Sequence, residues 1–185
     1  MNRFLCVKKE IDRLLALRPR VIVAIDGNCT SGKTTLARQL SEIYDCSVFH
    51  MDDFFLRPEQ RTPERFAEIG GNIDYERFLE EVLLPLRSGA EFSYRPFSCS
   101  TFTLSDPVSV RPGRLTIIEG TYSLHPRFGD SYDLKVRLTI SPELQRQRIL
   151  ERPAFLHHRF FQEWIPMEDR YFEAFRISEQ ADLVL

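Results

Sequence analysis

The sequence predicts an α/β fold in which five parallel strands form a central sheet with helices on both faces. Two observations carry this prediction. Short apolar segments alternate along the chain with segments of helical periodicity, which is the pattern of βαβ units. A glycine-rich stretch also stands directly between the first apolar segment and the helix after it. The expected strands are 21–25, 46–51, 115–120, 134–140 and 181–185.

Two helices are expected on either side of the first strand. Apolar residues such as Val7, Ile11 and Leu14 recur at helical spacing and predict an amphipathic helix over 1–18 that packs on the rest of the chain. The segment 36–44 follows the glycine-rich stretch and has helical character. Together with the strand between them, these helices form the first βα unit of the predicted fold.

The middle of the chain contains a loop, a helix and a ribbon. Residues 57–72 are polar and predict a loop. A helix is expected over 74–89, with Asp74 as a plausible N-cap and Gly89 just past its last turn. The segment 91–110 combines alternating and aromatic residues with turn residues, and this predicts a β-ribbon inserted beside the main sheet.

The last third of the chain contains two further helices. Ser141 is expected to cap the helix 141–152, and Pro142 fits its first turn. A mostly helical segment follows over 160–177, in which Pro166 should break or kink the helix.

Composition limits the classes of function. The chain has 185 residues, of which 43% are hydrophobic and 28% charged, and its net charge is −2. These values fit one globular domain over 1–185 and exclude the basic footprint of a nucleic-acid-binding protein. The four cysteines show no C-x-x-C spacing, so we expect neither a zinc site nor a framework of disulfides. We expect the protein to work in a reducing compartment, the cytoplasm. No signal peptide or membrane span is expected. The sequence does not decide between a monomer and a homo-oligomer.

Residues 27–34 read GNCTSGKT and match the phosphate-binding P-loop pattern G-x-x-x-x-G-K-[ST] at every fixed position. In this pattern, backbone N–H groups surround phosphate oxygens at a helix N-terminus. Lys33 should reach the β- and γ-phosphates of ATP, and the Thr34 hydroxyl should bind Mg²⁺. Cys29 fills a variable position. The expected phosphate-binding residues are Gly27, Asn28, Cys29, Thr30, Ser31, Gly32, Lys33, Thr34, Thr35 and Arg146.

Acidic residues follow two of the predicted strands, at the edge of a parallel sheet where ligands bind. Asp52 and Asp53 come after the second strand, where a carboxylate can accept a proton from an attacking hydroxyl or hold Mg²⁺ through water. Glu119 ends the third strand, at the position of a second Mg²⁺-site acid. Asp74 has two interpretations, a helix N-cap or an acceptor of hydrogen bonds from a sugar diol.

The combined pattern resembles the uridine kinase family of P-loop nucleoside kinases and their relatives, the nicotinamide riboside kinases. The stretches that carry the resemblance are "IDGNCTSGKTTLARQL", "CSVFHMDDFF", "NIDYERF", "IIEGTYSL", "RQRILER" and "ADLVL", in family order. "EWIPMEDRYFEAF" looks like the nicotinamide riboside kinases in particular. The resemblance implies the three-layer α/β/α fold of P-loop NTPases, with a helical lid over 146–165.

The resemblance also implies roles for single residues. Asp52 aligns with the base that activates the ribose 5′-hydroxyl, and Asp74 with the acid that binds the 2′- and 3′-hydroxyls. Tyr75 adjoins Asp74, and Glu119 aligns with the Mg²⁺-site acid. Lid arginines clamp the phosphates, although a solvated helix face is the alternative for each of them. The implied catalytic residues are Lys33, Asp52, Arg148 and Arg152, and the implied substrate-binding residues are Asp52, Asp53, Phe54, Asp74, Tyr75, Tyr94 and Phe97.

The chain departs from uridine and cytidine kinases at the expected ribbon. Those kinases follow a ribbon tyrosine with a histidine that reads the pyrimidine, whereas here Cys99 stands five residues after Tyr94. Arg95 stands where an aspartate is usual. Tyr94 and Phe97 could stack on a base or simply pack the ribbon onto the domain.

The expected activity is ATP-dependent phosphorylation of a nucleoside 5′-hydroxyl, with Mg²⁺ and uridine or cytidine as the nominal acceptor. Nicotinamide riboside is the second candidate, and another alcohol of the pantothenate or phosphoribulose type is the third. A switch GTPase is disfavoured because the chain lacks an N-K-x-D motif. A degenerate kinase is disfavoured because Lys33, Thr34, Asp52 and Glu119 are all present.

Overall fold

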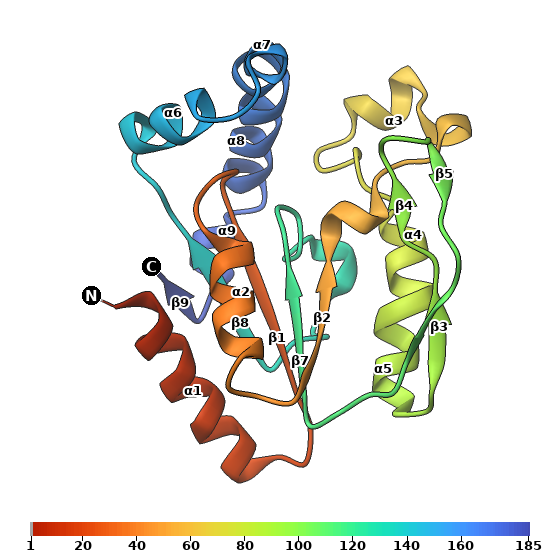
Figure 1. Ribbon diagram of the computed structural model, residues 1–185, viewed down its shortest axis with the longest axis vertical. Coiled ribbons are helices and arrows are strands. Elements are labelled where there is room, and N and C mark those ends of the chain that lie inside the picture. The colour runs from red at the N-terminus through yellow and green to blue at the C-terminus, as the bar shows by residue number, and fades with distance from the viewer. Residues whose placement is uncertain (1) are drawn as a thin grey trace.

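A five-stranded parallel sheet forms the centre of the molecule, of which the computed structural model describes residues 2–185 (Figure 1). The strand order is β2-β7-β1-β8-β9, so β1 lies in the middle. The strands are β1 (Val21–Gly27), β2 (Cys46–His50), β7 (Leu115–Glu119), β8 (Leu134–Leu138) and β9 (Leu183–Val184). The predicted three-layer α/β/α architecture with five parallel strands is confirmed.

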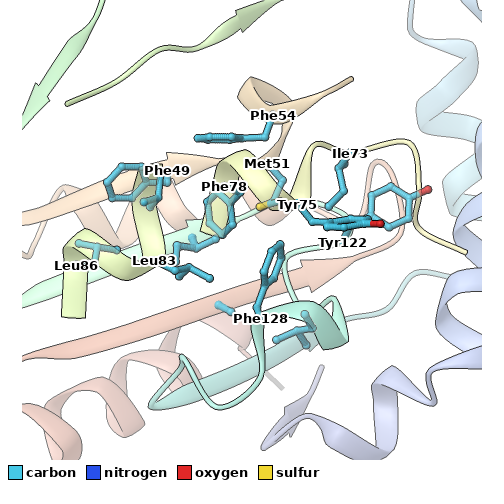
Figure 2. Packing of buried hydrophobic residues seen from close by; sticks show 14 of the residues in the cluster. Phe49, Met51, Phe54, Ile73, Tyr75, Phe78, Leu83, Leu86, Tyr122 and Phe128 are labelled. Atoms are coloured by element: carbon cyan, nitrogen blue, oxygen red, sulfur yellow. The ribbon is translucent and has the colours of Figure 1, made fainter. Parts of the chain in front are cut away.

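Helices cover both faces of the sheet because its buried strands carry apolar residues on both sides. On one face, α1 (Arg3–Leu17) and α2 (Lys33–Ser41) pack on Val23, Ile25 and other residues of β1, β7 and β8. On the other face lie α4 (Tyr75–Phe78), α5 (Leu84–Ser88), α8 (Ile165–Ala174) and α9 (Ile177–Gln180). Figure 2 shows the aromatic part of this second core, in which Phe78 meets Phe54 and Phe128 edge-on.

Two predicted helices differ in detail from the expectation. The helix 74–89 begins with Asp74 as N-cap and ends at Gly89, but its middle turn, η3 (Leu79–Leu83), is π-helical. The helix around Pro166 is not broken. A π-helical turn, η6 (Phe160–Trp164), leads directly into α8 with helical dihedrals at Trp164 and Ile165, so the helix continues through Pro166. Proline lacks the N–H of the regular helical hydrogen bond, and the hydrogen-bond pattern changes from π- to α-helical just before it.

Short helices occupy the segments between the main elements. The expected loop 57–72 contains two of them, each with proline in its first turn, as is typical of helix starts. The short helices are η1 (Met51–Phe54), η2 (Pro58–Gln60), α3 (Pro63–Ala67), η4 (Pro126–Phe128), η5 (Ala154–Leu156) and α7 (His157–Arg159). The expected lid, 146–165, begins within α6 (Pro142–Leu150), which Ser141 caps as expected.

The inserted ribbon is present as two antiparallel pairs. β3 (Phe92–Tyr94) pairs with β6 (Val108–Val110), and β4 (Phe97–Ser98) pairs with β5 (Thr103–Leu104). Figure 1 shows the ribbon and α3 on one side of the sheet edge where β1 ends, and α6, α7 and the start of α8 on the other side. Among the helices of residues 2–185, none is long and apolar enough to span a membrane.

Candidate active site

The P-loop joins the C-terminal end of β1 to the first turn of α2, as its sequence predicts. Gly32 has φ +100°, a left-handed conformation that side chains disfavour. A Cβ on Gly27 would lie 2.4 Å from the backbone oxygen of Leu138 on the neighbouring strand. The two fixed glycines of the motif therefore serve different needs, one conformational and one steric.

The ammonium of Lys33 is held against the start of the loop. It is almost fully buried and donates to the backbone oxygens of Gly27, at 2.7 Å, and Asn28, at 3.0 Å. A third contact joins it to the hydroxyl of Thr121, at 3.2 Å, in the turn after β7. The lysine charge thus lies inside the loop, where it can meet phosphate oxygens.

A hydroxyl and a carboxylate meet beside the loop. Thr34 donates to Glu119 Oε1 at 3.0 Å, and Nδ1 of His50 lies 2.6 Å from the same oxygen. Hard oxygen donors of this kind suit Mg²⁺, which usually takes only one or two protein ligands and otherwise uses water and phosphates. Within residues 2–185, no group of three or more His, Cys, Asp or Glu is placed to hold a metal.

Asp52 and Asp53 lie on η1, directly after β2. The Asp52 side chain reaches solvent, yet partial burial raises the pKa of its carboxyl, and the charge of Glu119 raises it further. The positive charges of Lys33 and Arg152 lower the pKa of the Asp52 carboxyl. Burial also raises the pKa of Asp53. Asp52 is therefore within the electrostatic reach of the P-loop lysine, the strand-end acid and the lid.

Asp74 is an N-cap in this structure. Its Oδ1 accepts from the backbone N–H of Arg77 at 3.1 Å, and the residue is 1% exposed. Its other oxygen lies 3.5 Å from Nε of Arg57 and 3.6 Å from Nε of Arg77. The Tyr75 hydroxyl donates to Glu68 at 2.7 Å, and the Tyr75 ring stacks on His125 at 5.0 Å between centroids. Contact between Asp74 and a sugar would require the arginines or the loop 57–72 to move.

The aromatic residues expected to bind substrate are largely packed into the protein. Phe54 is fully buried, Tyr94 is 7% exposed and Phe97 is 4% exposed. The Tyr94 ring stacks on Phe54 at 5.7 Å between centroids and tilts against Phe49 at 5.3 Å. In this geometry these rings fix the ribbon to the sheet, which was the second interpretation of the sequence.

The three lid arginines have different surroundings. Arg148 donates to the backbone oxygen of Thr30 at 2.7 Å and so ties α6 to the P-loop. Arg152 is exposed and lies close enough to Asp52 for its charge to lower the pKa of that carboxyl. The Arg146 guanidinium lies 5.1 Å from the Phe161 ring centroid, within the lid itself. Only the first two are turned toward the expected site.

Buried polar residues that the sequence analysis did not single out support the P-loop. Asp26, one residue before the motif, accepts from the backbone N–H groups of Gly27, Tyr122 and Leu124 and from the Tyr171 hydroxyl. Arg137 of β8 donates to Asn28 Oδ1 at 2.9 Å. Glu168 of α8 accepts from the Cys29 N–H at 2.8 Å. Each lies far from the loop in sequence except Asp26, so no local pattern pointed to the other two.

Known proteins resemble the chain in sequence over part of its length and in fold over almost all of it. No protein-family model matches the chain. Phosphoribulokinase from Synechocystis sp. (strain ATCC 27184 / PCC 6803 / Kazusa) is 25% identical over 130 residues, which is 68% of this chain and 39% of that enzyme. The chain thus matches less than half of the length of this curated relative.

Solved structures resemble almost the whole chain. A possible uridine kinase from Bacillus stearothermophilus has a TM-score of 0.71 at 24% identity, covering 97% of this chain and 98% of that one. A candidate fructose transport system kinase from Silicibacter sp. TM1040 has a TM-score of 0.70 at 23% identity, covering 100% and 99%. The chain therefore has the P-loop kinase fold, and the resemblance to uridine kinase-like proteins is confirmed at that level.

Proposed function

We propose that the protein is a Mg²⁺- and ATP-dependent kinase that phosphorylates the 5′-hydroxyl of a nucleoside, with uridine and cytidine as the first acceptors to test. One observation carries the proposal. A buried P-loop lysine, a hydroxyl–carboxylate pair fit for Mg²⁺ and an acid directly after β2, Asp52, lie at one edge of the sheet. Phosphoryl transfer needs little more than positioning and charge neutralisation, which such a set can supply.

Each group has a role in this proposal. The loop N–H groups and Lys33 would bind the phosphates, and Mg²⁺ at Thr34 and Glu119 would neutralise charge on them. Asp52 would accept the proton of the attacking hydroxyl. Arg148 and Arg152 would draw the lid over the phosphates and exclude water, which limits wasteful hydrolysis of ATP.

Arg61 favours a second kind of acceptor, an alcohol that also carries an anionic group. Its Nε donates to the Leu56 backbone oxygen at 2.9 Å, and its guanidinium lies 4.9 Å from the Phe102 ring centroid. Within residues 2–185, no acid lies within 4.0 Å of this guanidinium, whereas nearby Arg57 is paired with Glu59. Arg61 and Asp52 both influence the pKa of the Cys99 thiol, so they face a common region. A sugar phosphate would suit such a cation.

The test is an ADP-release assay with Mg·ATP and a panel of acceptors. The panel contains uridine, cytidine, deoxynucleosides, nicotinamide riboside, pantothenate and ribulose 5-phosphate. Turnover on uridine or cytidine supports the first proposal, and turnover on ribulose 5-phosphate alone supports the second. Asp52→Asn serves as the inactive control, which separates enzyme turnover from background hydrolysis. Absence of turnover on every acceptor would contradict both.

A further inference from the structure

An acidic side chain lies against the P-loop from the far end of the chain. Glu168 stands in the first turns of α8, which follows the lid segment, and is 5% exposed. Its Oε2 accepts from the Cys29 N–H at 2.8 Å. Its Oε1 lies 3.5 Å from the Thr121 hydroxyl. The same hydroxyl accepts a hydrogen bond from the Lys33 ammonium at 3.2 Å. One hydroxyl therefore connects this acid to the phosphate-binding lysine.

This placement has an electrostatic cost. P-loop N–H groups serve phosphate oxygens, yet here a loop N–H is bound by a carboxylate of the protein. Burying a carboxylate is unfavourable unless it is well paired. Glu168 accepts a backbone hydrogen bond from the Cys29 N–H and a weaker one from the Cys29 thiol, and no cation lies within 4.0 Å of it among the described residues. A glutamine could accept the same N–H bond without the charge. The charge itself therefore calls for an explanation.

We propose that Glu168 is a positioning residue of the P-loop that takes up a proton when ATP binds and so couples the loop to the lid-bearing helix α8. The proposal rests on ATP binding at the loop. In the protonated form the carboxyl still accepts from Cys29 through its C=O, while its O–H can donate to Thr121 or to a phosphate oxygen. The contact between α8 and the loop is then kept and the repulsion with the phosphates is removed.

The surroundings of Glu168 make protonation accessible near neutral pH. Burial raises the pKa of its carboxyl to about 7, while the Cys29 N–H and the Lys33 charge oppose this rise. Phosphates beside the carboxyl would raise the pKa further. The charged and titratable groups around it are Lys33 and Cys29 on the P-loop, Asp26 on β1, Tyr122 after β7, Arg137 on β8, and Asp169 and Tyr171 on α8.

The sign of the effect follows from linkage. A group that binds a proton more tightly in the ATP complex makes ATP binding tighter as pH falls. Between pH 8.5 and pH 6.5, we expect the Kd of Mg·ATP for the wild type to fall roughly tenfold more than that of Glu168→Gln. The nucleotide's own titration is the same for both proteins and cancels in this comparison.

Isothermal titration calorimetry with Mg·ATP tests the proposal. At pH 7.5, measurements in two buffers of different ionisation enthalpy give the protons taken up on binding. We expect the wild type and Glu173→Gln, an exposed change on the same helix, to take up more protons than Glu168→Gln. Equal uptake by all three proteins would overturn the proposal and leave the proposed kinase function standing.

Two further outcomes are decisive. A wild type that binds no Mg·ATP would overturn the proposed function and the role of Glu168 together. If Glu168→Gln does not fold, wild-type calorimetry at pH 6 and pH 7.5 still decides, because the proton uptake in excess of the nucleotide's own titration must be present at pH 7.5 and small at pH 6. A flat profile in the wild type would contradict the proposal.

Discussion

At the scale of single residues, the choice between Asp52 and Asp53 as base can be tested directly. We expect Asp52→Asn to lower kcat for phosphotransfer by roughly 10²-fold or more, because the attacking hydroxyl loses its proton acceptor. ATP binding should change little. The measurement is steady-state ADP release under saturating substrates, together with calorimetric ATP affinity.

Asp53→Asn is the matched control for this prediction. It makes the same chemical change one residue away on η1, where Tyr94 and not the P-loop is the nearby group. We expect its kcat to stay within a few-fold of the wild type. A loss of the size expected for Asp52 in the Asp53 variant alone would reverse the assignment of the pair.

Asp74 is a helix cap in this structure, whereas the family resemblance implies that it binds the sugar of the acceptor, and two substitutions separate these roles. Asp74→Asn keeps the N-cap contact to Arg77 but loses the charge, so it should raise the acceptor KM by about tenfold or more and leave the ATP KM nearly unchanged. Asp74→Ala should in addition lower stability by about 1 kcal/mol in urea unfolding. An unchanged acceptor KM in Asp74→Asn would reduce this residue to a helix cap.

At the scale of elements, the sequence predicted best where one local signal decides the structure. The strands 21–25 and 115–120 were found within two residues of their bounds because both are apolar, β-rich and short. Ser141 and Gly89 marked helix ends through their own chemistry. The π-helical turns at 79–83 and 160–164 were not predicted, although each comes directly before a proline, Pro85 or Pro166, in a helix that continues through it. Proline lacks the N–H of the regular helical hydrogen bond, so the sequence marked both places but not the form that the helix takes there.

The candidate site shows the same division. The P-loop and the strand-end acids could be found because each stands at a fixed place relative to a predicted strand. Glu168 and Arg137 could not, since only the folded chain brings α8 and β8 to the loop. His50 stands two residues before Asp52, but nothing in its spacing indicated the contact with Glu119.

The ribbon gives a prediction at this scale. Because the Tyr94 ring is buried against Phe49 and Phe54, Tyr94→Ala should destabilise the protein by about 3 kcal/mol, while Tyr94→Phe should cost less than about 1.5 kcal/mol. Urea unfolding measures both. Phe102→Ala, on the same ribbon but 49% exposed, is the control and should have little effect. A Tyr94→Ala variant of normal stability with a raised acceptor KM would instead indicate substrate stacking.

At the scale of the whole molecule, the packing around His125 links stability to pH. Its ring is 5% exposed, stacks on Tyr75 at 5.0 Å between centroids and on Tyr171 at 6.2 Å, and joins η4 to α4 and α8. Burial lowers the pKa of His125 to about 4. The unfolded chain has an ordinary histidine with a pKa near 6.5, so it binds a proton that the folded protein excludes.

The free energy of unfolding should therefore fall as pH drops from about 6.5 to about 4, and it should not depend on this group above that window. The pKa difference corresponds to a loss of roughly 3 kcal/mol at the acid end. His125→Phe keeps an aromatic ring in the stack and removes the titrating group, so its stability should decline less over the same window. Urea unfolding at pH 7.5, 6, 5 and 4 measures both slopes, with exposed His158→Gln as the control. If the free energy of unfolding fell equally with pH in the wild type and His125→Phe, other groups would govern acid unfolding. The aromatic stack would then join α4, η4 and α8 whether or not the residue at position 125 can bind a proton.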